Sequence, residues 1–60
     1  MLNYTIQILN ENIARRFDLS MNKQYPVISA DHEAHTIKHP INDERIEIPF
    51  KYTKEFRPKY

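Results

Sequence analysis

The residues best suited to bind a metal ion are three closely spaced histidines, His32, His35 and His39, with Asp31 and Glu33 beside them. Neutral imidazole nitrogens ligate zinc when a fold brings them into a tetrahedral arrangement. The spacing departs from the metalloprotease pattern His-Glu-x-x-His, because the second histidine comes one residue too early. We therefore treat the histidines as weak metal candidates and expect no cofactor. The competing interpretation places them on the solvated face of a hairpin, where His32 and His39 are too far apart to share an ion.

Basic and aromatic residues gather towards the C-terminus, which is typical of small barrels that bind single-stranded nucleic acid by base stacking and phosphate contacts. The group comprises Lys51, Tyr52, Lys54, Phe56, Arg57, Lys59 and Tyr60. Acidic residues lie in the same region, and the formal net charge of +1 is small for a nucleic-acid-binding domain. Nucleic-acid binding is one hypothesis; the other is that Tyr52 and Phe56 close the core while the lysines solvate it.

Two adjacent arginines followed by an aromatic residue, Arg15-Arg16-Phe17, have the composition of an interface hot spot. They lie in the long connection after the first predicted strand, which in a small barrel would flank the usual binding groove. The residues that we expect to contact a protein partner are Arg15, Arg16, Phe17, Tyr52, Lys54 and Phe56. The alternative is that Phe17 packs beneath the loop and the arginines only solvate it.

Residue patterns that support catalysis are missing from the sequence. Ser20 and Ser29 lack a histidine and a carboxylate in a recognisable order, and a chain without glycine has no glycine-rich loop to hold phosphate. A chain of 60 residues also has little room for a pocket that excludes water. We therefore predict a binding protein that is not an enzyme.

Strands are the elements that position most of these residues. Residues 2 to 9 and 45 to 53 alternate apolar and polar side chains, as strands with one buried and one solvated face do. Residues 24 to 30 predict another strand, whose Pro26 belongs at an edge or at the strand's start because proline cannot donate to a ladder. Residues 10 to 18 predict a long excursion with at most two helical turns, capped by an asparagine.

The segment from residue 30 to 39 fits either a hairpin or a helix. As a hairpin, Asp31-His32 is the turn and Thr36-Ile37-Lys38 lies in the returning strand. As a helix, the segment is capped by Ser29 and stopped by Pro40. The β-branched residues on both sides of the turn favour the hairpin, because they suit paired strands.

These elements predict one all-β domain over residues 1 to 60, a barrel of about five short strands. The alternative is an α+β domain with a helix over residues 30 to 39. The expected core comprises Leu2, Tyr4, Ile6, Ile8, Leu19, Tyr25, Val27, Ile37, Ile46, Ile48, Phe50 and Phe56.

Composition sets the broad class of the protein. The chain has no cysteine, which excludes a disulfide framework, and its hydrophobic share of 40% is enough for a modest core. Apolar runs are too short for a membrane-spanning helix or a signal peptide, so we expect a soluble, cytoplasmic protein. Because there is no glycine, Asn or Asp must fill the turn positions with positive φ, and Asn42-Asp43 is one candidate.

The segment Leu19-Ser20-Met21-Asn22-Lys23-Gln24-Tyr25-Pro26-Val27-Ile28 resembles the Leu-Thr-x-Gly-Lys-x-Tyr-x-Val-Ile segment of small barrel proteins encoded by phages and prophages of low-GC bacteria. Asn42-Asp43, Ile48-Pro49 and a following phenylalanine match a later part of that pattern, whereas Asn22 and Glu44 or Arg45 stand where glycine is usual. The resemblance implies a five-stranded Src-homology-3-like barrel. It does not imply a chemistry.

Because the sequence lacks a catalytic pattern and the chain is small, we predict a module that binds a protein partner. With the resemblance, it would be a phage-encoded modulator or inhibitor of a host or competing protein, acting in the host cytoplasm. We also expect a homodimer, formed by antiparallel pairing of the last long strand with Glu47 opposite Lys51 of its copy. The alternative is that Pro49 and these charges block such pairing and keep the chain monomeric.

Overall fold

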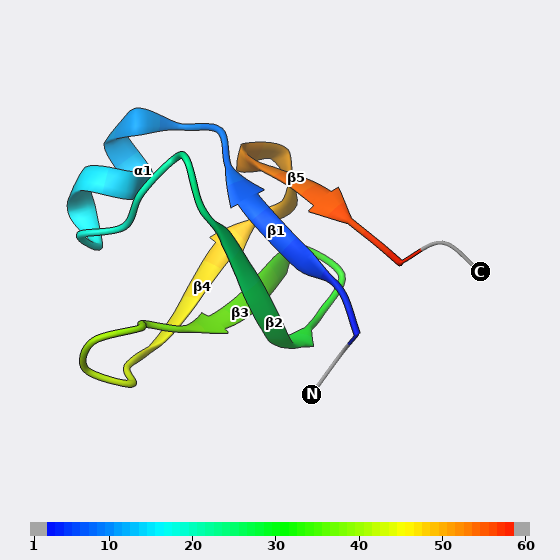
Figure 1. Cartoon of the computed structure of the whole chain (residues 1–60). Helices are drawn as coiled ribbons and strands as arrows, with labels where there is room; N and C mark the ends of the chain where they lie inside the picture. The colour runs from blue at the N-terminus through cyan, green and yellow to red at the C-terminus, as the bar shows by residue number, and fades with distance from the viewer. Residues whose placement is uncertain (1–2, 59–60) are drawn as a thin grey trace.

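Five antiparallel strands in the order β4-β3-β2-β1-β5 form one sheet (Figure 1), as a computed structural model that describes residues 3–58 shows. The elements in chain order are β1 (Thr5–Ile8), α1 (Glu11–Arg16), β2 (Gln24–Ala30), β3 (Ala34–Lys38), β4 (Arg45–Pro49), the 3₁₀ turn η1 (Phe50–Tyr52) and β5 (Thr53–Phe56). The predicted five-stranded all-β fold is therefore confirmed. The sheet is not closed, because β4 and β5 at its two ends are not paired with each other within residues 3–58.

Strand β2 joins the two halves of the sheet. Its first residues pair with β1, where Pro26 lies opposite Thr5, and its pairing with β3 begins at Val27 opposite Ile37. A register shift between Val27 and Ser29 marks a bulge, which bends a strand and increases its twist. Pro26 precedes the part of β2 that pairs with β3, so its missing N–H leaves no gap in the ladder. The predicted position of Pro26, at an edge or at the start of its strand, is wrong, because Pro26 is the third residue of the central strand β2.

Residues 30 to 39 form a hairpin, and the alternative of a helix over this segment is wrong. Asp31 closes the turn: its Oδ1 accepts hydrogen bonds from the backbone N–H groups of Glu33 at 2.7 Å and Ala34 at 2.8 Å. The same two bonds hold the pKa of Asp31 below its usual value. Strand β3 then pairs with β2 on one side and β4 on the other, and this cross-strand pairing outweighs the helix signals at Ser29 and Pro40.

The single strand predicted over residues 45 to 53 is wrong, because the chain turns after Pro49. The last ladder bond runs from the N–H of Phe50 to the carbonyl of Glu33 at 2.9 Å. Residues Phe50–Tyr52 then form η1, and Thr53 Oγ1 donates to the carbonyl of Phe50 at 3.0 Å. Strand β5 leaves this turn and pairs with β1 instead (Figure 1).

The core agrees with the sequence wherever the strand alternation holds. The residues that were predicted and are buried are Tyr4, Ile6, Ile8, Tyr25, Val27, Ile37, Ile46 and Ile48. Leu19 and Phe56 are only half-buried, and Phe50 is partly exposed although its ring packs on the buried His35. Leu2 lies outside the described residues. Three buried residues were not predicted, namely Ala14, His35 and His39.

The left-handed backbone positions are filled by aspartates. Asp43 has a φ of 60°, as the candidate turn at Asn42-Asp43 predicted, and Asp18 has a φ of 56° just after α1. Short polar side chains tolerate this conformation better than other non-glycine residues. The chain therefore makes both turns without glycine.

Helix α1 is the short helical excursion that the sequence predicted, and Asn10 caps it. Its Oδ1 accepts a hydrogen bond from the N–H of Ile13 at 3.1 Å. We expect Asn10→Ala to lower the free energy of unfolding by about 1 kcal/mol, because an N–H of the first turn loses its partner. Asn12→Ala, an exposed change inside the same helix, is the matched control. Urea denaturation of both variants measures the difference, and equal losses would contradict a capping role.

Candidate functional site

A groove lies between α1 and β4, and it brings together three of the six residues predicted to bind a partner. Arg16 and Phe17 reach it from the end of α1, and Tyr52 reaches it from η1. The hollow has a volume of about 510 Å³. We call it the α1–β4 groove, and its lining residues are Asn10, Asn12, Ile13, Arg16, Phe17, Glu47, Pro49 and Tyr52.

Phe17 partly fulfils both predictions made for it, contact with a partner and packing beneath the loop. It is half-buried and packs against the core, yet it also lines the α1–β4 groove. Arg16 beside it is exposed. Arg15 is not among the groove residues, because its Nη2 pairs with Glu11 Oε1 at 2.8 Å along the exposed side of the helix. The two adjacent arginines therefore differ in position, and only Arg16 lines the groove.

A buried histidine fixes the end of α1 that carries these groove residues. His39 Nδ1 accepts a hydrogen bond from the N–H of Ile41 at 3.2 Å, so its Nε2 carries the proton and donates to the carbonyl of Asp18, also at 3.2 Å. The N–H of Leu19 donates to the carbonyl of Ala14 at 2.8 Å and closes the helix end. His39 thus ties the β3–β4 loop to the left-handed residue that follows Phe17. No pattern in the sequence indicated that His39 would hold this contact.

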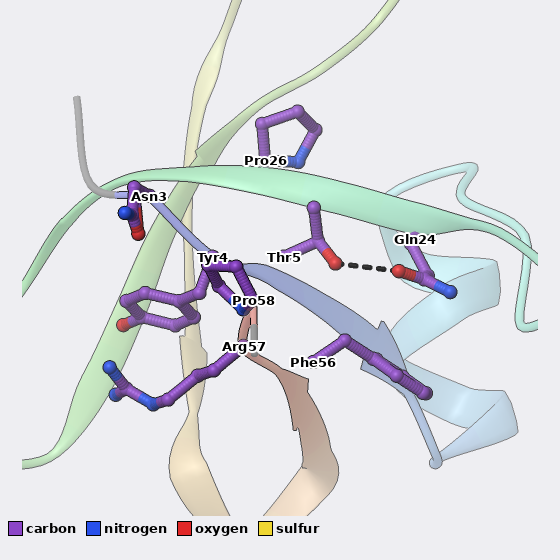
Figure 2. A pocket seen from close by; sticks show the side chains of 8 residues that line it. All are labelled: Asn3, Tyr4, Thr5, Gln24, Pro26, Phe56, Arg57 and Pro58. Atoms are coloured by element: carbon purple, nitrogen blue, oxygen red, sulfur yellow. Dashed lines mark hydrogen bonds between the residues drawn. The ribbon is translucent and has the colours of Figure 1, made fainter. Parts of the chain in front are cut away.

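Lys54 and Phe56, the other predicted contact residues, lie on β5 and not in the α1–β4 groove. Lys54 Nζ is 5.4 Å from the centre of the Phe56 ring. Phe56 helps to line a second hollow of about 490 Å³ with Thr5, Gln24 and Pro26. Figure 2 shows this hollow, with Phe56 on one side and the stacked Tyr4 and Arg57 on the other. The predicted set of contact residues is therefore divided between two places.

A second unpredicted histidine, His35, lies in the core with its side chain only 1% exposed. Its Nδ1 is hydrogen-bonded to the Tyr4 hydroxyl at 2.7 Å, and the two rings meet edge to face. The Phe50 ring covers it with a centroid distance of 4.4 Å. Its Nε2 lies 3.4 Å from Glu55 Oε2 but outside hydrogen-bond geometry, so this buried nitrogen has no hydrogen-bond partner among residues 3–58.

Burial keeps both members of the Tyr4–His35 pair uncharged. Loss of solvation lowers the pKa of His35, and the nearby Glu55 carboxylate opposes that shift only in part. Burial and Glu55 together raise the pKa of Tyr4, while the Arg57 guanidinium, 4.2 Å from the centre of the Tyr4 ring, opposes them. The hydrogen bond between them connects the start of β1 to β3, and the imidazole itself is closed to solvent.

The three histidines do not converge on one point. His32 is exposed at the turn, 3.8 Å from a carboxylate oxygen of Glu33, whereas His35 and His39 each bond to a different part of the fold. Within residues 3–58, no group of three or more histidine, cysteine or acidic side chains is placed to hold a metal ion. The alternative of a solvated histidine face is wrong for His35 and His39, which share the buried face of Ile37.

Comparisons of the chain with protein-family models, with curated proteins and with solved structures find no match. The part of the chain that the structure describes contains no helix with the length and apolar character needed to cross a membrane. The geometry of the α1–β4 groove is therefore the basis for a functional proposal.

The buried His35 makes stability depend on pH. The unfolded chain binds a proton at this histidine near its ordinary pKa of 6.5, whereas the folded chain does so only at lower pH. The contribution of neutral His35 is therefore complete above pH 6.5 and falls as the pH drops from there towards the lowered pKa of the folded state. We expect His35→Gln to remove this part of the pH dependence, and the exposed control His32→Gln to keep it. Urea titrations between neutral and mildly acidic pH measure both; identical slopes in the two variants would contradict the assignment.

Proposed function

We propose that this chain is a non-enzymatic module that binds a protein partner in the α1–β4 groove. One observation carries the proposal: an arginine and two aromatic residues from separate parts of the chain, Arg16, Phe17 and Tyr52, meet beside the free strand β4. Arginine and aromatic side chains dominate the energetics of protein interfaces. A domain of this size can also present the roughly 800 Å² that a specific interface needs.

The lining of the groove indicates what the partner should offer. Ile13, Phe17, Pro49 and Tyr52 make an apolar surface that suits an aliphatic or aromatic anchor. Charges of both signs flank it, from Arg16 on the helix side and from a glutamate on β4. The partner therefore presents an apolar side chain with polar neighbours that complement both charges.

The resemblance to phage-encoded barrels extends the proposal to a biological role. In that role, the chain is a modulator or inhibitor that acts in the host cytoplasm by covering a surface of a host or competing protein. It would act by occupancy, because the histidine best placed for proton transfer, His35, is sealed inside the core.

Nucleic-acid binding is the less favoured function, for a geometric reason. Lys51 Nζ lies 5.1 Å from the centre of the Tyr52 ring, and Lys54 lies similarly over Phe56. A base that stacked on the lysine-covered face of either ring would first have to displace that lysine. Salt dependence separates the two functions, because binding through phosphates weakens steeply as salt rises.

The adjacent arginines provide a matched test of the protein-binding proposal. The immobilised chain captures its partner from a lysate of a low-GC bacterium, and the captured protein is then titrated against variants. We expect Arg16→Ala and Phe17→Ala each to weaken binding by about 2 kcal/mol or more, as hot-spot truncations do, and Arg15→Ala to have little effect. Circular dichroism checks that the Phe17 variant is folded. Equal losses in the two arginine variants, or capture of nuclease-sensitive material alone, would contradict the proposal.

A further inference from the structure

The outer edge of β4 presents unpaired backbone groups. Two backbone hydrogen bonds show which residue pairs between β3 and β4 are hydrogen-bonded. The N–H of His39 donates to the carbonyl of Glu44, and the N–H of Phe50 donates to the carbonyl of Glu33. In an antiparallel ladder, paired and unpaired residues alternate, so Arg45 and Glu47 direct their N–H and C=O groups away from β3. No backbone group from the turns and loops within residues 3–58 bonds to either residue. This edge is therefore ready to accept another strand.

The side chains on this edge also lack charged partners. Arg45 lies opposite Lys38 of β3, and like charges directly opposite each other destabilise a sheet. Glu47 lies opposite Thr36, which carries no charge. None of the ion pairs found in residues 3–58 includes Arg45 or Glu47. An added strand that placed a carboxylate beside Arg45 and a cation beside Glu47 would supply what the monomer lacks.

We propose that the strand added to β4 is the β4 of a second copy of this chain. The two strands run antiparallel about a two-fold axis at Ile46, so that Arg45 of each copy lies opposite Glu47 of the other. Each of these two pairs exchanges both N–H···O=C bonds, because both residues direct their backbone groups outward. Opposite charges then face each other twice on the solvated side of the new sheet.

Other registers of the two β4 strands have less favourable charge contacts and hydrogen bonds. A two-fold axis at Glu47 would place that glutamate opposite its own copy, and it would set Arg45 against Pro49, which has no N–H to give. The register predicted from the sequence, with Glu47 opposite Lys51, is lost because Lys51 lies in η1 and not in the strand. Charge and hydrogen bonding therefore select the axis at Ile46.

The antiparallel arrangement also accounts for an exposed aliphatic residue. Ile41, in the loop between β3 and β4, is 82% exposed. Because the two β4 strands run in opposite directions, this loop of each copy approaches the η1 end of the other, where Tyr52 lines the α1–β4 groove. The dimer consequently brings the loop of each copy towards the η1 end of the groove in the other.

Charge reversal tests the register directly. Sedimentation equilibrium from low to high micromolar protein measures the dimer of the unaltered chain and of the variants Arg45→Glu and Glu47→Arg. Each single reversal makes both cross-strand pairs repulsive, so we expect the dissociation constant to rise about tenfold or more. The double variant restores both attractions and should dimerise as the unaltered chain does. Lys23→Glu, an exposed charge reversal in the turn before β2, is the matched control and should change nothing.

Mixing the two single variants gives the decisive result. The Arg45→Glu variant presents two carboxylates along the edge of β4, and the Glu47→Arg variant presents two guanidinium groups. An equimolar mixture should therefore form heterodimers, although each variant alone dimerises more weakly. An unaltered chain that stays monomeric at high micromolar concentration, with a melting temperature independent of concentration, would overturn the proposal. So would a mixture that associates no better than its components. Circular dichroism of each variant separates loss of pairing from loss of folding.

Discussion

Pro49 holds its φ at −57° at the end of β4, and the course of the chain follows from the turn that begins after this residue. Strand β4 ends there, η1 reverses the direction, and β5 returns to pair with β1 instead of extending β4. The reversal leaves β4 at one end of the sheet with an open edge. It also places Tyr52 opposite the end of α1, where the α1–β4 groove forms. The groove and the free edge are thus two consequences of the same local constraint.

Two buried histidines then join elements that the strand ladders leave apart. The Tyr4–His35 hydrogen bond connects β1 to β3, which are separated by β2 in the sheet. The bond from His39 to Asp18 connects the β3–β4 loop to the end of α1. Buried polar groups stabilise a fold when their partners are in place and destabilise it when a partner is missing, so such contacts define one arrangement. In a chain of 60 residues without cysteine, these side-chain bonds take a role that disulfides have in many small domains.

Much of the sheet was predictable, because alternation in a strand is a local property. The interior side of β1 and the buried pair Ile46 and Ile48 follow directly from it, whereas the hairpin of β2 and β3 was favoured over a helix because of its β-branched residues. The end of β4 at Pro49 was not predicted, because the apolar parity continues through Phe50 and Tyr52. The proline itself was a sign that the strand ends there. His35 and His39 share the parity of Ile37, and this was a usable sign of burial that their polar character obscured. The groove was not predictable as a whole, because it depends on the approach of residues 10 to 17 to residues 47 to 52, which no local pattern encodes.

The charges on β4 resolve the conflict between an open edge and the need to avoid aggregation. Natural edge strands carry charges and prolines that prevent indiscriminate pairing. A strand with charges of one sign would repel every copy of itself, whereas Arg45 and Glu47 carry opposite signs at alternate positions. Such an edge repels its copy in the register centred on Glu47 and attracts it in the register centred on Ile46. Pro49 also disfavours the registers in which pairing extends towards η1, because it has no N–H to donate to the second strand. The features that protect the edge against unspecific pairing are therefore the same features that leave one specific register open.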